Sequence, residues 1–255
     1  MVDFELYLGD CLEKMPLMAE SGIRANLIIC DLPYGKANKS KLYDNPLPLD
    51  KLWECYNKIL TPGGVVILFG MGFYYAQIVM SNLKMFRHDY VWDKVLTSGH
   101  LNSGYMPMRK HENIAVFYKL GKSVTYNHQF TKGKPLHSKG SKYLTKELTN
   151  NNWGEIGVIP DHRVGSTQKF PTSILTFQKP AASKLVHRSE KPVELLRWLI
   201  RTYSNPGDVV LDNCTGSGSC AEAAIIERRN FVGVEIDKTQ FDKASKRAEQ
   251  ARGLF

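Results

Sequence analysis

The chain has 255 residues, of which 43% are hydrophobic and 23% are charged. This length and balance predict one large, soluble α/β domain, because the chain can bury a sizeable core. The longest apolar stretch, residues 65–76, is shorter than the roughly 20 residues that span a bilayer. Acidic residues at positions 3, 5 and 10 do not fit a secretory signal, so we expect a cytoplasmic protein without a membrane segment.

The positive charge is concentrated in one segment. Residues 119–188 contain 12 Lys and Arg against three acidic residues, an excess that equals the net charge of +9 of the whole chain. Aromatic residues are interleaved with these cations: Tyr126, Phe130, Tyr143, Trp153, Phe170 and Phe177. Cations and stacking rings together favour a nucleic-acid-binding surface, although a solvated lysine-rich loop would have the same composition.

Short apolar runs alternate with amphipathic stretches, which predicts a doubly wound, mostly parallel sheet with crossover helices. Strands are predicted at Glu5–Leu8, Asn26–Cys30, Val65–Phe69, Asp89–Trp92, Ile114–Tyr118, Val209–Leu211 and Phe231–Val234. Helices are predicted at Leu49–Leu60, Pro192–Tyr203, Ser219–Arg228 and Lys238–Ala251. Residues 120–185 lose this alternation and are rich in Lys, Gly, Ser, Thr and Asn, so we predict an insertion there.

The first functional motif follows the second predicted strand and reads Asp31-Leu32-Pro33-Tyr34-Gly35. An aromatic amine is a poor nucleophile because its lone pair is delocalised, so a catalyst must draw the nitrogen toward tetrahedral geometry. The Asp31 carboxylate and the Leu32 carbonyl can each accept an amine hydrogen, and Pro33 restricts Leu32 to extended conformations. Tyr34 offers a ring on which an extruded base can stack. An ordinary proline turn would have the same sequence.

The second functional motif follows the strand at Val209–Leu211, where Asp212 begins a glycine-containing loop before a helix. Gly216 and Gly218 allow the backbone to turn sharply and to approach a bound ligand. The next strand ends in Glu235, at the separation where nucleotide folds place a ribose-binding carboxylate. The loop also fits the G-x-G-x-x-A pattern of NAD-binding proteins, but a carboxylate at position 212 would repel a pyrophosphate.

Together these motifs resemble the β group of DNA N6-adenine and N4-cytosine methyltransferases. Residues 31–34 resemble the (D/N/S)PPY signature of amino-methyltransferases, and residues 212–218 resemble their S-adenosylmethionine loop, DxFxGxG. Further segments resemble the family's opening turn, its central motifs and its methionine-binding segment: residues 8–12, 92–94, 107–119 and 187–196. Because the catalytic motif precedes the cofactor motif, the resemblance implies a circularly permuted methyltransferase fold with a seven-stranded sheet.

The resemblance also implies residue roles. The catalytic residues would be Asp31, Leu32, Pro33 and Tyr34. The residues that bind S-adenosylmethionine would be Asp10, Cys11, Asp31, His187, Lys191, Asp212, Cys214, Gly216, Gly218, Glu235 and Ile236. Two departures stand out: Leu32 replaces the first proline but keeps its carbonyl, whereas Asn213 and Cys214 replace Pro-Phe and remove a ring. The five cysteines form no CxxC pair, so reduced thiols are expected rather than disulfides or a metal site.

A methyltransferase of this group would methylate the exocyclic amine of a base flipped out of double-stranded DNA, and a homodimer is compatible with the resemblance. Aspartate rather than serine at position 31 favours N6 of adenine over N4 of cytosine. The family order places a target-recognition region at residues 120–185, between a catalytic half, residues 1–119, and a cofactor-binding half, residues 186–255. The polar stretch at residues 36–48 is expected to close over the base.

Three other classes of protein remain open from the sequence. An RNA or protein amino-methyltransferase would share both motifs, and only the basic insertion argues for DNA. A nicotinamide oxidoreductase would use the glycine loop for a different cofactor. A DNA-binding module without catalysis would need the basic segment alone, and the catalytic turn argues against it.

Overall fold

The computed structural model describes residues 2–35, 45–135, 149–150, 154–155, 166–179 and 190–254. The chain divides into two compact units. The larger consists of Met1–Asn127 and Ser173–Phe255, and the smaller of His128–Thr172. No helix in the described ranges has the length and apolar character that crossing a membrane requires.

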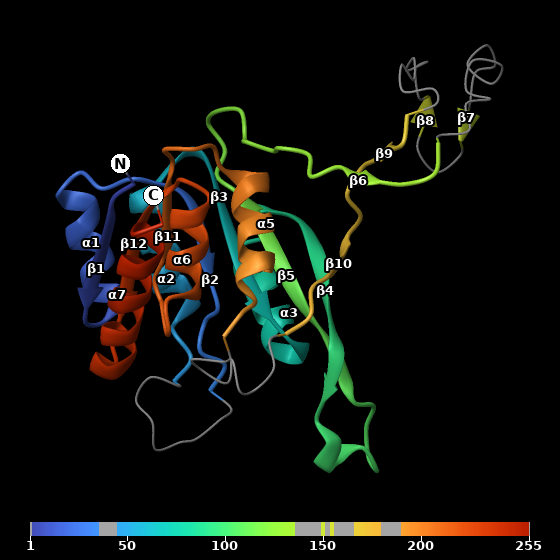
Figure 1. Cartoon of the computed structure of the whole chain (residues 1–255), viewed down its shortest axis with the longest axis horizontal. Helices are drawn as coiled ribbons and strands as arrows, with labels where there is room; N and C mark the ends of the chain where they lie inside the picture. Colours follow the sequence, from blue (N-terminus) through green and yellow to red (C-terminus); the bar gives the residue numbers. More distant parts are fainter. Residues whose placement is uncertain are drawn as a thin grey trace. The chain divides into compact units, whose positions relative to one another are not determined.

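The larger unit is built on an eight-stranded sheet in the order β1-β12-β11-β2-β3-β5-β4-β10 (Figure 1). The strands are β1 (Phe4–Leu8), β2 (Ala25–Cys30), β3 (Leu60–Gly70), β4 (Phe86–Ser98), β5 (Arg109–Tyr118), β10 (Ile174–Thr176), β11 (Val209–Asp212) and β12 (Asn230–Glu235). Neighbouring strands are parallel, except that β5 is antiparallel to both β3 and β4.

The predicted fold class is confirmed, and each of the predicted strands is present. The sheet has one strand more than expected, because β10 pairs with β4 at the edge. Of its three residues only Leu175 is buried, so the segment has no apolar run that periodicity could detect.

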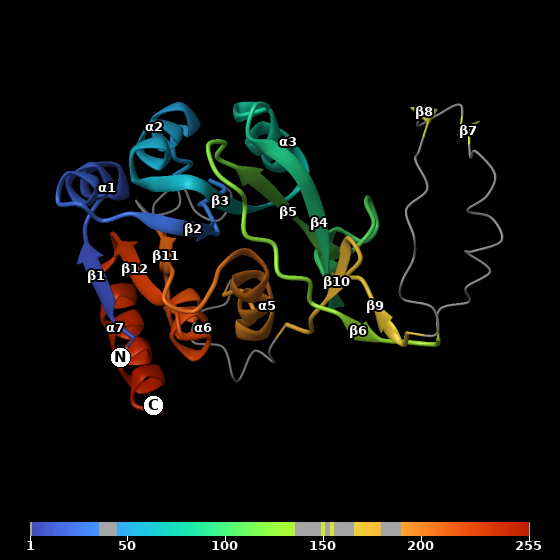
Figure 2. The same ribbon diagram turned by 90° about the horizontal axis from the view of Figure 1, so that it is seen from above.

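Helices cover both faces of the sheet (Figure 2). One layer contains α1 (Cys11–Glu20), α2 (Leu49–Ile59) and α3 (Gly72–Ser81), and the other α5 (Val193–Tyr203), α6 (Ser219–Ile226) and α7 (Lys238–Arg252). The four predicted helices are confirmed, whereas α1 and α3 were not predicted. Pro16 lies inside α1, and α3 exposes Phe73 and Met80, so neither segment shows a regular amphipathic pattern.

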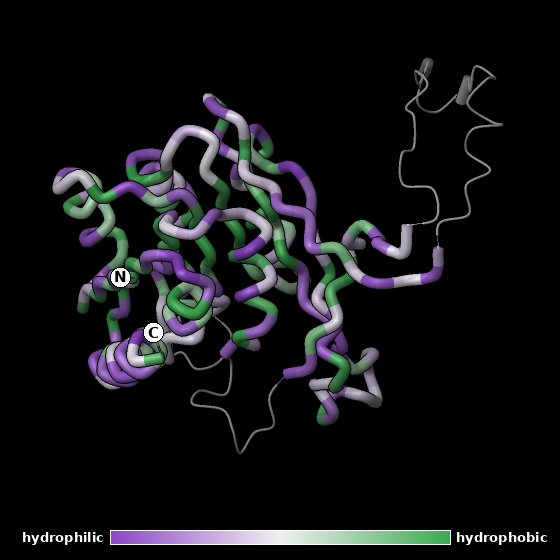
Figure 3. Tube along the Cα trace, turned by 45° about the horizontal axis from the view of Figure 1, so that its top comes forward, coloured by the Kyte–Doolittle hydropathy of each residue, from purple (hydrophilic) through white to green (hydrophobic). Residues whose placement is uncertain are grey.

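The central strands are buried on both faces, which explains their continuous apolar sequences. Along β2, Leu27 and Ile29 pack with α5 and α6 in one core, whereas Ile28 and Cys30 belong to the core under α1 and α2. Figure 3 shows the resulting hydrophobic stretches within the sheet and the mostly hydrophilic residues of α7.

The direction in which successive strands are added to the sheet reverses between β2 and β11. These two strands pair as parallel neighbours through Leu27↔Val210 and Ile28↔Leu211. From β11 the chain continues through α6 to β12 on one side, and from β2 through α2 to β3 on the other. Such a switch point opens a crevice at the carboxyl ends of the strands, where ligands bind in doubly wound folds. Asp31 and Asp212 lie at this edge.

In the smaller unit, β6 (Thr131–Lys132) pairs with β9 (Gln168–Lys169), and β7 (Thr149–Asn150) pairs with β8 (Gly154–Glu155). Three rings cluster beside the first pair: Phe130 lies 5.5 Å from His128 and 5.1 Å from Phe170 between ring centroids. The predicted insertion, residues 120–185, contains this unit, but β10 belongs to the main sheet. Tyr143, Trp153, His187 and residues 36–44 lie outside the described residues.

Candidate active site

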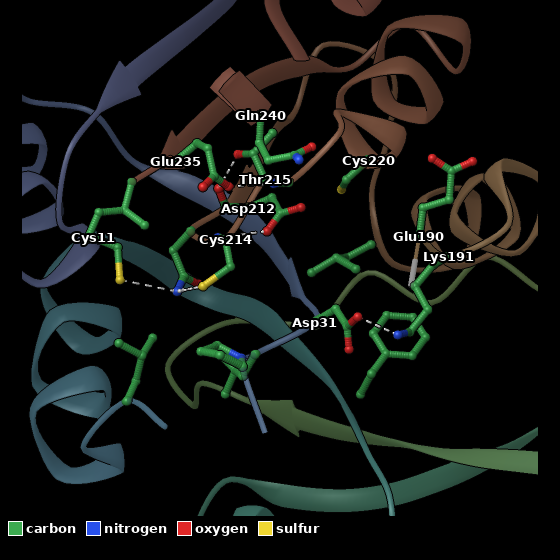
Figure 4. Close-up of a pocket in the computed structure, with 18 of the residues that line it drawn as sticks. Cys11, Asp31, Glu190, Lys191, Asp212, Cys214, Thr215, Cys220, Glu235 and Gln240 are labelled. Carbon is green, nitrogen blue, oxygen red and sulfur yellow. Dashed lines mark hydrogen bonds and ion pairs between the residues drawn. The ribbon is translucent and has the colours of Figure 1, made fainter. Parts of the chain in front are cut away.

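A cavity of about 960 Å³ lies at the carboxyl edge of the sheet. Most of the residues predicted to form the site line it: Asp10, Cys11, Asp31, Leu32, Pro33, Tyr34, Lys191, Asp212, Cys214, Gly216, Glu235 and Ile236. The catalytic turn after β2 and the glycine loop after β11 therefore face one space, although they are far apart in the sequence (Figure 4).

Gly218 lies at a different place in the loop from Gly216. It does not line the cavity but is the N-cap of α6, with a φ of 83°. A Cβ atom at this position would lie 2.8 Å from Cα of Ala244, so the glycine allows α6 to pack closely on α7. The structure thus shows a packing role for Gly218, whereas Gly216, with a φ of 56°, lines the cavity.

Glu235 fixes the glycine loop as well as facing the cavity. Its Oε2 accepts a hydrogen bond of 2.7 Å from the Gly216 N–H, and its Oε1 accepts one of 2.8 Å from the Asp237 N–H. A carboxylate has about four acceptor positions, so hydroxyl groups of a ligand can still bind there. Nearby, Gln240 lines the cavity, and its buried Oε1 has no hydrogen-bond partner within the described part of the chain.

Asp10, Asn213 and two cysteines form the adjacent wall. Asp10 caps α1 by accepting a 2.8 Å hydrogen bond from the Leu12 N–H. The Asn213 Nδ2 lies 3.6 Å from Sγ of Cys11 and 3.5 Å from Sγ of Cys214, and Tyr56 donates to Asn213 Oδ1 at 2.6 Å. The Cys214 contact, followed by burial, raises the pKa of the Cys11 thiol. These thiols are therefore neutral lining groups rather than nucleophiles.

Asp212 is a buried carboxyl at the end of β11. Burial raises its pKa from 3.8 to about 7, although its Oδ1 accepts a hydrogen bond of 3.1 Å from the Cys214 N–H. The folded protein therefore holds a proton on Asp212 in mildly acidic solution, where an unfolded chain has lost it.

This raised pKa predicts a specific pH dependence of stability. The cost of burying the Asp212 charge is full above pH 7 and disappears as the pH falls toward 4. Asp212→Asn keeps a carbonyl for the Cys214 N–H, so we expect it to be about 4 kcal/mol more stable than the wild type at pH 8. Near pH 4 the two should be equally stable. Urea unfolding at both pH values measures the difference, and a difference that does not change with pH would contradict this explanation.

The catalytic turn holds its aspartate between two donors. Tyr34 donates its hydroxyl to Asp31 Oδ1 at 2.9 Å, and Lys191 donates to Asp31 Oδ2 at 2.5 Å. The Tyr34 ring packs against Tyr74 with 5.0 Å between centroids, and the Leu32 side chain is buried in the core. Burial of Leu32 therefore anchors the turn at the position where the family signature has its first proline.

Two further charged residues, Lys94 and Glu112, complete a network that the sequence did not reveal. Glu112 lies 3.3 Å from Lys191 through Oε2 and 3.3 Å from Lys94 through Oε1, so carboxylates and ammonium groups alternate from Asp31 to Lys94. Burial opposes the charge on Glu112, but the two ammonium groups outweigh it and lower the pKa. Burial likewise opposes the charge on Lys191, but Asp31 and Glu112 raise its pKa. Glu112 and Lys191 therefore hold each other in the ionised form.

The glycine loop, the acidic residue after the next strand and the acid-aromatic turn across the switch point define a cofactor-dependent enzyme with the methyltransferase fold. The model of the N6/N4 DNA methylase family matches residues 25–246, and the chain belongs to this family. The predicted family is thus confirmed, and the oxidoreductase alternative loses its support.

Some individual relatives are named as adenine methyltransferases, some as cytosine-N4 methyltransferases, and others without a target base. Type II methyltransferase M.HpaI of Haemophilus parainfluenzae is 25% identical over 97% of this chain and 75% of its own. DNA adenine methyltransferase YhdJ of Escherichia coli K12 is 24% identical over 95% of this chain and 82% of its own. Among solved structures, the M1.HpyAVI–SAM complex aligns with a TM-score of 0.66 and 20% identity, over 96% of this chain and 98% of that one. The cytosine-N4-specific PvuII DNA methyltransferase aligns with a TM-score of 0.63 and 15% identity, over 100% of this chain and 92% of that one.

Proposed function

We propose that the protein transfers a methyl group from S-adenosylmethionine to N6 of an adenine flipped out of double-stranded DNA. The observation that supports this proposal most directly is that Asp31 and Gly216 line the same cavity. Membership of the DNA methylase family supports methyl transfer to DNA rather than to RNA or protein.

The cavity has the groups that S-adenosylmethionine requires. Free acceptor positions on Glu235 suit the ribose hydroxyls, and the unpartnered Gln240 Oε1 suits a further donor of the cofactor. Cys11, Cys214 and Ile236 offer apolar surface beside Asp10, which fits a flat heterocycle even without the phenylalanine of the family motif. When bound, the cofactor supplies an electrophilic methyl group.

The residues of the catalytic turn then orient the acceptor amine. With a donor on each oxygen, the Asp31 carboxylate is fixed in direction and is available as a hydrogen-bond acceptor. It can accept one amine hydrogen, the Leu32 carbonyl can accept the other, and Tyr34 can stack on the base. The nitrogen becomes acidic as it gains the methyl group, so its proton leaves afterwards. Positioning and charge complementarity supply the main catalytic contribution.

The basic segment is assigned to DNA under this proposal. Residues 119–188 carry the net positive charge of the chain, which suits contacts with phosphates, and we propose target recognition within residues 120–185. In the described part of this region, Phe130, His128 and Phe170 form a ring cluster of the kind that can stack on bases.

A product assay tests the proposed reaction. The protein is incubated with unmethylated genomic DNA and labelled S-adenosylmethionine, and the DNA is digested to nucleosides for mass spectrometry. N6-methyladenine is the expected product. Label in N4-methylcytosine would move the specificity to cytosine, and label only in parallel RNA or protein reactions would overturn the proposal.

A further inference from the structure

A long β-hairpin projects from the carboxyl edge of the sheet beside the cavity. β4 is parallel to β3, because β5 is antiparallel to both, so β4 ends at the edge where Asp31 lies. Residues 94–111, which we call the hairpin arm, extend past the neighbouring strands (Figure 1). At the base of the arm, Trp92 and Glu112 both line the cavity, so a molecule bound at the base of the arm lies next to the cavity.

The tip of the arm carries apolar side chains that face solvent. Leu101 is 93% exposed and Tyr105 is 92% exposed, on a short 3-10 turn, His100–Asn102, and the turn that follows it. Val95, Leu96, Met106 and Met108 are exposed as well. Single exposed apolar residues are common, but a group of them on one projecting element marks an interaction surface.

The backbone at the base of the hairpin arm contains a β-bulge. The register of β4 and β5 shifts between Asp93 and Ser98, and Val95 within this bulge has a φ of 64°. This conformation is strained for a β-branched residue. Asp93 supports it by accepting a 2.9 Å hydrogen bond from the Val95 N–H. Bulges bend and twist a hairpin, so this one sets the direction in which the arm points.

The charged residues of the hairpin arm indicate what kind of molecule it binds. Between Asp93 and Glu112 the sequence contains Lys94, Arg109 and Lys110 and no acidic residue. Lys94 is buried in the network with Glu112, whereas Arg109 is exposed at the base of the arm. Lys110 is also exposed, and its ammonium lies 3.6 Å from the Asp93 carboxylate, a surface ion pair that a phosphate can replace. Exposed cations below an apolar and aromatic tip fit a nucleic acid, whose phosphates bind the cations and whose bases accept an inserted or stacked side chain.

From these observations we infer that the hairpin arm binds double-stranded DNA next to the flipped base, with Leu101 and Tyr105 packing against exposed bases or sugars. This inference rests on the proposed function and adds a DNA contact outside residues 120–185. The ionic link from Lys94 through Glu112 to Lys191 joins the base of the arm to Asp31.

The test compares Leu101→Ala/Tyr105→Ala with the wild type and with a matched control, Met80→Ala/Leu83→Ala. The control removes two exposed apolar side chains at the end of α3 that lies away from the cavity edge. Affinity is measured by fluorescence anisotropy with a labelled random-sequence duplex of about 30 base pairs in low salt. We expect the arm variant to bind the duplex at least about fivefold more weakly, and Tyr105→Phe to retain the affinity. S-adenosylmethionine binding, the melting temperature and the control should not change.

The outcomes separate this inference from the proposed function. Normal methylation and duplex binding by the arm variant would overturn only the inference. A wild type that binds no duplex would overturn the proposed function and the inference with it. Light scattering adds a third outcome: if the arm variant changes from dimer to monomer, the tip covers a second copy of the chain and the DNA contact is wrong.

Discussion

Asp31→Ala is expected to lower the rate of methyl transfer by roughly a hundredfold to a thousandfold, the scale on which losing a fixed catalytic hydrogen bond acts. The carboxylate lies in the cavity, where Tyr34 holds one oxygen and Lys191 the other. The alanine side chain has no acceptor oxygen that these donors could hold in the same position. The groups that line the cofactor side, Glu235 and Asp10, do not depend on it. S-adenosylmethionine should therefore bind the variant within a few-fold of its wild-type affinity, as calorimetry can measure.

Two milder variants control for the removal of buried charge. Asp31→Asn keeps one acceptor oxygen but loses the charge that balances Lys191, and it should retain more activity than Asp31→Ala. Tyr34→Phe keeps the stacking ring and loses one hydrogen bond to Asp31. We expect the rate of methyl transfer to fall by roughly tenfold or less. Equal activity in Asp31→Ala and the wild type, or a parallel loss of cofactor binding and activity, would show that Asp31 does not act on the base.

The parts of the site that could be predicted from the sequence are those determined by strand ends. β2 and β11 are short, apolar and buried on both faces, so their positions are evident, and parallel strands deliver their next residues to one edge. Asp31, Asp212 and Gly216 could therefore be assigned to a common cavity from the sequence alone. Glu235 could be assigned by the same reasoning, because β12 is the next strand of the sheet.

The remaining features depend on contacts between side chains that the sequence does not order. Lys94 and Glu112 meet only because β4 and β5 pair in a particular register, and Lys191 joins them from the segment before α5. The packing of Gly218 against α7 has no sequence signature of its own, because only the fold brings Ala244 close to it. Charge patterns along the chain contain no information about such a network.

The alternating network makes Lys191 the residue whose replacement should most affect stability. Lys191→Met removes the ammonium group that contacts both Asp31 and Glu112, whereas the contact between Glu112 and Lys94 remains. Breaking a buried pair from one side costs about 3–5 kcal/mol, which urea unfolding at pH 8 would detect. Lys238→Met is the matched control, because its ammonium pairs with Asp242 on the exposed surface of α7, where about 0.5 kcal/mol or less is expected.

A double variant distinguishes lost electrostatics from lost packing. Asp31→Asn/Lys191→Met removes one negative and one positive charge and leaves the Lys94–Glu112 pair intact, so it should recover about 1–3 kcal/mol relative to Lys191→Met. The pH supplies a second criterion. The pKa of Glu112 is lowered in the fold, so its stabilising contribution is present above its unfolded pKa and is lost as the pH falls through the folded value. The loss of stability in Lys191→Met relative to the wild type should therefore be smaller in acid than at pH 8. If the loss is the same in acid and at pH 8, and the same in the double variant, Lys191 acts only by packing over the Phe69 ring.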